Sequence, residues 1–264
     1  MGRTDAIARA LEVFVQGFSF TRSFTHPYLG ERVGPLWVMR DAPRPLTRQG
    51  KPGKYRTEEW VACGIPSVEI DRIVRKHARG RFAICVLRSS DEPREAISVD
   101  AMRAEFKEMS YRLMSTEPLM IHSLKQIPSF EEPAAIERVS SQEMADRVNK
   151  AARSRQILPE HLRSDGSLAA PMRQYVALVD GELVGRGASV TTGDATWVSN
   201  MFVRPELRRR GIARSIMSRM LRDDREAGAL QSVLLASHTG AMLYPVVGYE
   251  QIGTLYTYTG RLQK

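Results

Sequence analysis

Residues 200–220 read Asn-Met-Phe-Val-Arg-Pro-Glu-Leu-Arg-Arg-Arg-Gly-Ile-Ala-Arg-Ser-Ile-Met-Ser-Arg-Met, and the rest of the chain is interpreted around them. The first part of this stretch is apolar enough to form a strand. Its last part repeats apolar residues at helical spacing, at Ile212, Ile216, Met217 and Met220. A turn that ends at Gly211 separates the two parts. Such a turn leaves the unpaired N–H groups of a helix N-terminus aimed at one point, which suits a phosphate or a pyrophosphate.

Three consecutive arginines, Arg208, Arg209 and Arg210, add positive charge to this turn. Neither standard phosphate-loop pattern fits, because the stretch has no second glycine and no Lys-Ser or Lys-Thr pair after the first. The pattern that fits is Arg-x-x-Gly-x-Ala after a Val-x-Pro strand end, formed by Arg208, Gly211, Ala213, Val203 and Pro205. The alternative interpretation is an ordinary strand-to-helix connection with a cluster of surface arginines.

This pattern resembles the acetyl-CoA-binding signature of the GNAT superfamily of N-acetyltransferases, in which Gln/Arg-x-x-Gly-x-Gly/Ala follows a Val-x-Pro strand end. A second stretch, at 237–249, reads Ser-His-Thr-Gly-Ala-Met-Leu-Tyr-Pro-Val-Val-Gly-Tyr. It resembles the second GNAT motif, in which a helix carries a tyrosine a few residues before Gly-Phe/Tyr. The resemblance covers about residues 134–258, nearly half of the chain, with the motifs in the correct order. It identifies a superfamily and no particular protein.

The resemblance implies a fold of the α/β (α+β) class, with a mixed, mostly antiparallel central sheet flanked by helices and divided into two lobes. The residues before the turn agree with this fold. Predicted strands at 173–179 and 182–190 are joined by Asp180-Gly181, a tight hairpin signal, and a third strand at 196–203 leads into the turn. The remaining predicted elements are helices at 141–154, 211–226 and 238–247 and strands at 135–139, 232–236 and 249–258.

The N-terminal half begins with a predicted helix at 4–17 and a loop at 17–35. Its later elements follow the order strand, strand, helix, strand, helix, strand, which resembles the second half of a GNAT lobe. Residues 106–113 resemble the closing pattern of that lobe, with Ser110 in place of glycine. At the place of the cofactor turn, residues 64–66 read Gly-Ile-Pro and lack the arginine pattern. We therefore interpret this half as a degenerate lobe that binds no CoA.

The boundary between the halves is predicted near 128–133, where two prolines flank a polar junction. This division gives a degenerate GNAT-like or accessory domain at 1–130. It leaves residues 131–264 as the GNAT acetyltransferase domain.

The composition of the 264 residues, of which 42% are hydrophobic, is sufficient for packed cores. No run of 18 or more apolar residues is present, and the N-terminus lacks the apolar core of a signal peptide, so we expect a soluble, cytoplasmic protein without a membrane partner. The two cysteines, Cys63 and Cys85, are expected to be reduced and buried. They lack metal-ligand spacing and the five histidines do not cluster in sequence, so no metal site is predicted.

A formal net charge of +9 and a pI near 9.8 favour anionic ligands, of which CoA is one and nucleic acid another. The positive residues do not form a basic tail, and aromatic residues are not interleaved with them. Nucleic acid is therefore not the expected partner. The sequence does not indicate an oligomeric state.

The resemblance also implies which residues bind acetyl-CoA, the expected cofactor. The N–H groups of residues 209–213, including those of Ile212 and Ala213, surround the pyrophosphate, and arginine side chains reach the outer phosphates. A backbone N–H among Met201, Phe202 and Val203 polarises the thioester carbonyl. In relatives the strand separates from its neighbour at this point, and the pantetheine arm fills the gap.

Two further residues of the second motif match family positions. Tyr244 is expected to protonate the departing CoA thiolate, and the alternative for it is a half-buried packing residue. Ser237 is expected either to hydrogen-bond the pantetheine or to serve as a plain helix cap.

The base that deprotonates the ammonium form of the substrate is not evident. The central strand carries Trp197, Ser199 and Asn200 where relatives often have Glu. A water chain ordered by Asn200, or a carboxylate from Glu160 or Asp165, are the options that the sequence leaves open.

The leading hypothesis is an acetyl-CoA-dependent N-acyltransferase that moves an acetyl group directly to an amine acceptor, either a small molecule or a peptide. A non-catalytic acyl-CoA-binding or regulatory protein is the alternative, favoured by the missing strand carboxylate. A nucleic-acid-associated protein is favoured by charge alone. The acceptor cannot be inferred from the sequence.

Overall fold

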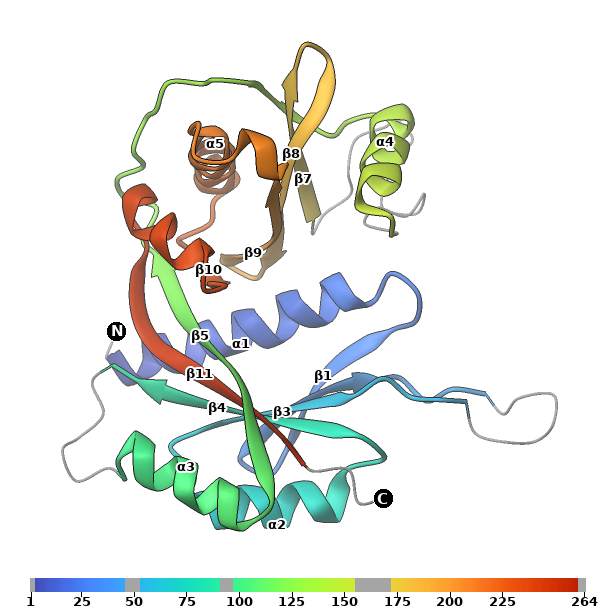
Figure 1. Cartoon of the computed structure of the whole chain (residues 1–264), viewed down its shortest axis with the longest axis vertical. Coiled ribbons are helices and arrows are strands. Elements are labelled where there is room, and N and C mark those ends of the chain that lie inside the picture. The colour runs from blue at the N-terminus through green and yellow to red at the C-terminus, as the bar shows by residue number, and fades with distance from the viewer. Residues whose placement is uncertain (1–2, 46–52, 91–96, 155–171, 261–264) are drawn as a thin grey trace. The chain divides into compact units, whose positions relative to one another are not determined.

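The computed structural model describes residues 3–45, 53–90, 97–154 and 172–260 and divides into two compact units (Figure 1). Unit 1 combines the first residues, up to Thr25, with Met120–Glu250. Unit 2 combines His26–Leu119 with the residues from Gln251 onward. Each unit therefore draws on separate parts of the sequence. The division predicted at residue 130 refers to contiguous segments and stays a prediction.

Unit 1 contains a five-stranded arrangement in the order β6-β7-β8-β9-β10. Neighbouring strands are antiparallel except β9 and β10, which are parallel. Its elements are α1 (Arg3–Arg22), β6 (Ala135–Arg138), α4 (Gln142–Ala152), β7 (Met172–Val179), β8 (Glu182–Thr192), β9 (Ala195–Val203), η2 (Pro205–Leu207), α5 (Ile212–Glu226), β10 (Gln231–Leu235), η3 (Gly240–Met242) and η4 (Tyr244–Val247). The mixed, mostly antiparallel sheet flanked by helices is confirmed. The short helix predicted at 238–247 is instead two separate 3₁₀ turns, η3 and η4.

Unit 2 orders its strands β1-β2-β3-β4-β11-β5, with β3 and β4 parallel and β11 antiparallel to β4. Its elements are β1 (Tyr28–Val33), β2 (Leu36–Asp41), β3 (Glu58–Cys63), α2 (Ser67–His77), β4 (Phe82–Ser89), α3 (Val99–Glu108), β5 (Tyr111–His122) and β11 (Glu250–Gly260). Helices α2 and α3 lie side by side in Figure 1 and bury apolar residues in one core with the strands. The strand predicted at 249–258 exists, and it pairs with β4 of unit 2 rather than closing the sheet of unit 1.

The loop predicted at 17–35 is wrong in part. Helix α1 continues to Arg22, and β1 follows as one strand of a hairpin with β2. The hairpin turns at Gly34, whose φ of +57° lies in the left-handed region. The glycines and aromatic residues of this segment indicated a loop. The segment forms a strand because its backbone pairs with β2.

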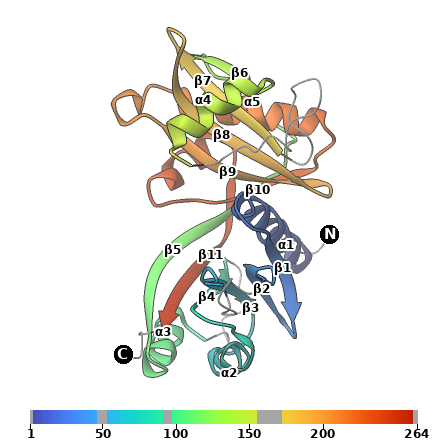
Figure 2. The same cartoon turned by 90° about the vertical axis from the view of Figure 1, so that its right-hand side faces the viewer.

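The two faces of the unit 1 sheet are covered by different helices, and α4 and α5 lie on opposite sides of β7 and β8 (Figure 2). The predicted apolar face of α5 is confirmed, since Ile212, Ile216, Met217 and Met220 are all at most 3% exposed. Fully burying such a side chain stabilises a fold by about 1.5–3 kcal/mol. Packing thus fixes the orientation of α5 on the sheet.

A buried carboxylate attaches the last part of α5 to three strands. Asp224 is 0% exposed and accepts hydrogen bonds from Arg173 Nη2 (2.7 Å), Ser189 Oγ (2.7 Å) and Thr196 Oγ1 (2.9 Å). Burial raises the pKa of this carboxyl, while the Arg173 charge and the hydrogen bonds act in the opposite direction. Because every bond is directed, Asp224 sets the position of α5 along its axis.

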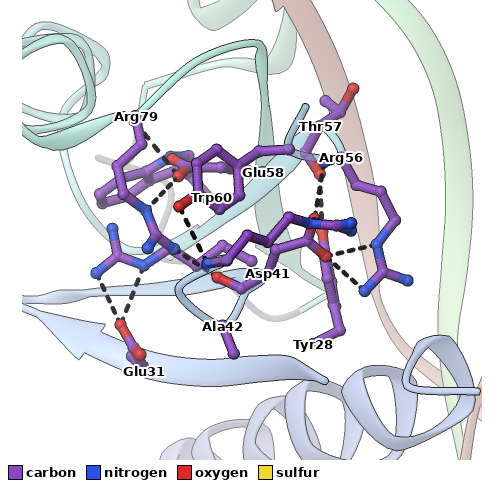
Figure 3. Close-up of polar contacts among 12 residues, drawn as sticks. Tyr28, Glu31, Asp41, Ala42, Arg56, Thr57, Glu58, Trp60 and Arg79 are labelled. Atoms are coloured by element: carbon purple, nitrogen blue, oxygen red, sulfur yellow. Dashed lines mark hydrogen bonds and ion pairs between the residues drawn. The ribbon is translucent and has the colours of Figure 1, made fainter. Parts of the chain in front are cut away.

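Unit 2 holds its own charges in a compact ion network (Figure 3). The Asp41 carboxylate accepts from the Arg56 backbone N–H (2.9 Å) and from Arg44 Nη2 (2.8 Å). Burial raises the Asp41 pKa, but the hydrogen bonds from Arg56 and Arg44 outweigh it, so the pKa is lowered. Glu58 accepts from Arg79 Nε (3.1 Å), and Arg79 Nη2 also donates to the Asp41 carbonyl oxygen (2.8 Å). These arginines are therefore compensated inside the unit.

Helix α1 approaches β9 of unit 1 so closely that no side chain fits at Gly17. The rings of Phe14 and Trp197 lie 5.3 Å apart, and a Cβ added at Gly17 would lie 2.2 Å from the Trp197 Cβ. Glycine is therefore required here by contact distance.

Gly17→Ala is expected to lower the free energy of unfolding by about 1–3 kcal/mol, because overpacking outweighs the higher helix propensity of alanine. Urea denaturation measures the change. Gly80→Ala is the control, since nothing lies within 4 Å of a Cβ at Gly80, and its effect should stay within about 0.5 kcal/mol. A Gly17→Ala protein as stable as the parent would show that α1 and β9 are not in this contact.

Candidate active site

The end of β9, the turn after it and the residues of η3 and η4 surround one cleft of about 980 Å³ in unit 1. The cleft brings together most of the residues predicted for the site: Met201, Phe202, Val203, Arg208, Arg209, Arg210, Gly211, Ile212, Ala213, Ser237 and Tyr244 all line it. Asn200 is not among its lining residues and lies directly before them on β9. Two stretches about 30 residues apart in the sequence thus meet at one place, as the motifs indicated.

The turn before α5 has two residues in the left-handed region, Arg209 with φ 61° and Gly211 with φ 89°. The first bond of the helix is donated by Ser215 N–H to the Gly211 carbonyl oxygen (3.1 Å). Gly211 caps the helix without a side chain, so the N–H groups of residues 212–214 find no acceptor in the described chain. Left-handed turns and free helix N–H groups both create anion-binding concavities.

The charge at this helix start is the reverse of the usual pattern. A helix N-terminus carries a partial positive charge and is stabilised by Asp or Glu. The first turn of α5 has no acidic residue, and arginines surround it instead. Each like charge there is unfavourable by about 0.3–1 kcal/mol. An anionic ligand would remove this repulsion.

Two arginines show how the turn is built. Arg208 Nε donates to the Val203 carbonyl oxygen (3.0 Å), which ties the turn to the end of β9. Sequence reasoning missed Arg214, which lines the cleft and lies 5.1 Å above the Phe130 ring. Its buried Nε has no hydrogen-bond partner in the described chain. The signal that would have found it is a basic residue in the first turn of a helix.

Strand β9 separates from β10 before it reaches the cleft. The two strands pair only from Ala195 to Trp197, although β9 continues to Val203. This confirms the separation that the resemblance implied. On its other side β9 bulges: Ala188 of β8 pairs with Ser199 and Arg186 pairs with Phe202, so β9 carries one extra residue. Asn200, with φ 56°, forms this bulge and redirects the N–H groups that follow it.

Tyr244 is 7% exposed, and its ring contacts Tyr249 edge-on at 5.7 Å. Burial raises the pKa of the Tyr244 hydroxyl to about 12, so the group stays protonated at neutral pH. The residue both packs and lines the cleft, so the structure is compatible with the packing role and with the proton-donor role. Ser237 Oγ accepts from the Gly240 N–H (3.2 Å) at the start of η3, and Ser237 also lines the cleft, so both roles expected for it stay predictions.

No base is evident in the cleft. Glu206, an exposed residue of η2, is the one carboxylate among the lining residues that the structure describes. Ser199 and Asn200 are half-buried at the bulge. Glu160 and Asp165, the carboxylates considered from the sequence, lie outside the described residues.

Among the described residues no group of three or more His, Cys, Asp or Glu side chains is arranged to hold a metal ion. Cys85 is buried, as predicted, and burial raises the pKa of its thiol to about 12. Cys63 is half-buried, so the prediction of burial is wrong for this residue. None of the helices in the described ranges has the length and apolar character needed to span a bilayer.

The model of the acetyltransferase (GNAT) domain matches residues 171–251, which contain the cleft. Residues 171–251 are a GNAT domain. This domain supports an acyltransferase activity. No curated protein sequence matches the chain.

Solved structures with this fold match nearly the whole chain. A GCN5-related N-acetyltransferase from Kribbella flavida is 16% identical, with a TM-score of 0.61 and coverage of 95% of each chain. A GCN5-related N-acetyltransferase-like protein from Streptococcus suis is 12% identical, with a TM-score of 0.55 and coverage of 98% of this chain and 100% of that one. At these identities the likeness shows the fold. It extends beyond the GNAT domain to the residues of unit 2.

The corresponding turn of unit 2 lacks the features of the GNAT turn. Helix α2 is capped by Pro66, which has no N–H to donate, and its first turn contains Glu69. The carboxylate of Glu69 complements the positive end of the helix, so no anionic ligand is required there.

One CoA molecule per chain is therefore expected to saturate the protein. Isothermal titration calorimetry with CoA measures this stoichiometry directly. A value of two would show that unit 2 also binds the cofactor.

Gly211→Asp is expected to abolish CoA binding, whereas Gly211→Asn should retain most of it. Asparagine has the shape of aspartate and tolerates a positive φ, so the pair separates charge from backbone strain. Two like charges about 4 Å apart repel by about 4 kcal/mol at an effective dielectric constant of about 20. Calorimetry on both folded variants decides, and unchanged affinity in Gly211→Asp would contradict the assignment of this turn.

Proposed function

We propose that the protein transfers an acetyl group from acetyl-CoA directly to the amine of a small molecule or a peptide. The observation that carries this proposal is the start of α5, where three N–H groups without acceptors in the described chain and four arginines line one cleft, and where the first helical turn has no acidic residue. The GNAT match supports acyl transfer in general, and the donor and the acceptor class are our inference. The cytoplasmic location predicted from the sequence stays a prediction.

The described residues fit CoA at both ends of the cleft. The N–H groups of residues 209–214 suit the pyrophosphate, because oriented N–H groups and a helix dipole favour a doubly charged anion. Arg210 and Arg214 suit the outer phosphates as charge-assisted donors. The gap that opens between β9 and β10 after Trp197 suits the narrow pantetheine arm, whose amides can pair with strand groups that have no neighbour.

When bound, acetyl-CoA supplies an activated acyl group as a thioester. The chain would supply the rest. An N–H among Met201–Val203, turned by the Asn200 bulge, donates to the oxygen that gains negative charge during attack. The Tyr244 hydroxyl gives its proton to the leaving sulfur. Because the described cleft has no suitable carboxylate, we infer that a water held near Asn200 takes the proton from the amine.

A non-catalytic acyl-CoA-binding or regulatory protein is the second candidate. The specific observation that favours it is the identity of the β9 residues, Ser199 and Asn200, where a carboxylate would serve as base. Acetyl-CoA consumption in the presence of a panel of amines separates the two candidates. Tight CoA binding without acetylation of any amine would support the second.

Tyr244→Phe is expected to slow acetyl transfer by roughly 100-fold or more, about 3 kcal/mol of barrier, while CoA affinity and folding persist. The ring and its packing remain, so only the proton donor is lost. Rapid-quench single-turnover kinetics measures the transfer step even where product release limits steady-state turnover.

Tyr249→Phe is the matched control for this variant. Tyr249 is buried beside Tyr244, but its hydroxyl is hydrogen-bonded to Ser232 Oγ (2.7 Å) and does not line the cleft. Its loss should affect stability and not the single-turnover rate. A full-rate reaction by Tyr244→Phe would assign the proton transfer to water and leave Tyr244 a packing role.

A further inference from the structure

Arg186, in the middle of β8, is a partly desolvated cation without a counter-ion. Its guanidinium has no salt bridge to any carboxylate of the described chain, and its buried Nε has no hydrogen-bond partner there. Burial lowers its pKa, and no negative charge acts against that effect. Its guanidinium carbon lies 4.7 Å above the centre of the Phe202 ring.

A partly desolvated guanidinium without a counter-ion is unfavourable in free energy. Arg173, on the neighbouring strand β7, is in a different situation. Arg173 on β7 is paired with buried Asp224. Removing a charge from water without a partner costs free energy that a ring contact restores only in part. A ligand anion that pairs with Arg186 would supply the missing partner.

Other unpaired polar groups lie beside Arg186 on the same face of the sheet. In the strand register Gln174, Ala188 and Ser199 stand directly opposite one another on β7, β8 and β9. Gln174 is 0% exposed, and neither its Nε2 nor its Oε1 has a partner in the described chain. Ser199 Oγ is also buried and unpaired. Because Arg186 is two residues from Ala188, its side chain emerges on this face as well.

This face is opposite to the one that α5 covers. Ser189 points toward α5, where it binds Asp224, so its neighbours on β8 point the other way. The face nevertheless meets the cleft at its edge, because Phe202, the residue under Arg186, also lines the cleft. A molecule held by Arg186 therefore lies next to the β9 bulge, across the sheet from the helix that suits the cofactor phosphates.

We propose that Arg186, supported by Ser199 and Gln174, binds a carboxylate of the amine acceptor, so that the preferred substrates are amines that also carry a carboxylate. This inference rests on the acetyl transfer proposed above. A carboxylate fits better than a phosphate, because one guanidinium with neutral hydrogen-bonding neighbours matches a single negative charge. A bidentate pair with guanidinium also orients the acceptor toward the bulge.

The test uses pairs of probes that differ only in the carboxylate: free amino acids against their primary amides, and short peptides with free against amidated C-termini. The full-length protein is assayed with acetyl-CoA, and kcat/KM is measured for each probe. At least one carboxylate-bearing probe should exceed its amide by roughly 10- to 100-fold, the range of a hydrogen bond to a charged group. Amides that are equally good or better, or acetylation of amides alone, would overturn the proposal.

Arg186→Gln should erase that preference by raising KM for the carboxylate form, while Arg186→Lys keeps part of it. CoA affinity should not change in either variant, and the Tm of Arg186→Gln should equal or exceed that of the parent, because a partly buried charge without a counter-ion in the described chain is removed. Arg204→Gln is the control: Arg204 is half-buried, pairs with Glu182 (3.6 Å) and does not line the cleft. An unchanged probe ratio in Arg186→Gln, or a clear fall in its Tm, would contradict the ligand role.

The outcomes also separate this inference from the function on which it rests. If the amide probes are acetylated and the carboxylate probes are not, acetyl transfer remains the function and only the role of Arg186 is excluded. If the unmodified protein neither binds CoA nor acetylates any probe, the proposed function and the role of Arg186 are both excluded.

Discussion

Helix α5 begins with N–H groups that no residue of the described chain satisfies, and basic side chains surround them. Both features oppose folding of the isolated turn, because free N–H groups lack partners and the arginines repel the positive end of the helix dipole. The rest of unit 1 holds this unfavourable arrangement in place. Apolar burial along α5 and the Asp224 bonds fix the helix on the sheet, and Arg208 fixes the turn to β9. Packing energy thus maintains the turn that we propose as an anion site.

The two units differ in whether their arginines are paired with acceptor groups of the chain. In unit 2 the arginines Arg44, Arg56 and Arg79 are paired with buried carboxylates or carbonyl oxygens, so their charges are compensated within the fold. In unit 1 neither the arginines at the turn nor Arg186 on β8 pairs with a carboxylate of the described residues, although Arg208 donates to the Val203 carbonyl oxygen. Net charge alone does not show this difference. An arginine that is paired with a carboxylate or carbonyl oxygen of the chain contributes to the fold, whereas an arginine without such a carboxylate is available to an anionic ligand.

The sequence was sufficient for features that depend on local chemistry. The apolar spacing of α5, the Asp180-Gly181 hairpin and the convergence of the turn with Tyr244 were all predictable, because each follows from residue type and position. The separation of β9 from β10 came with the family resemblance. The Asn200 bulge was not predictable, since it depends on how β9 aligns with β8. The strand at 28–33 depends likewise on its pairing with β2. The placement of β11 in unit 2 depends on its pairing with β4, which is far away in the sequence. Arg186 could not be recognised as unpaired until its neighbours were known.

The backbone amides at the start of α5 provide the most direct test that this turn binds the cofactor pyrophosphate. Titration of isotope-labelled protein with CoA, followed by amide NMR, should move the resonances of Ile212, Ala213 and Arg214 strongly downfield as their N–H groups gain acceptors. Pantetheine, which lacks the phosphates, should leave these three resonances nearly unchanged. Binding of CoA without any shift at these amides would contradict the assignment and place the cofactor elsewhere.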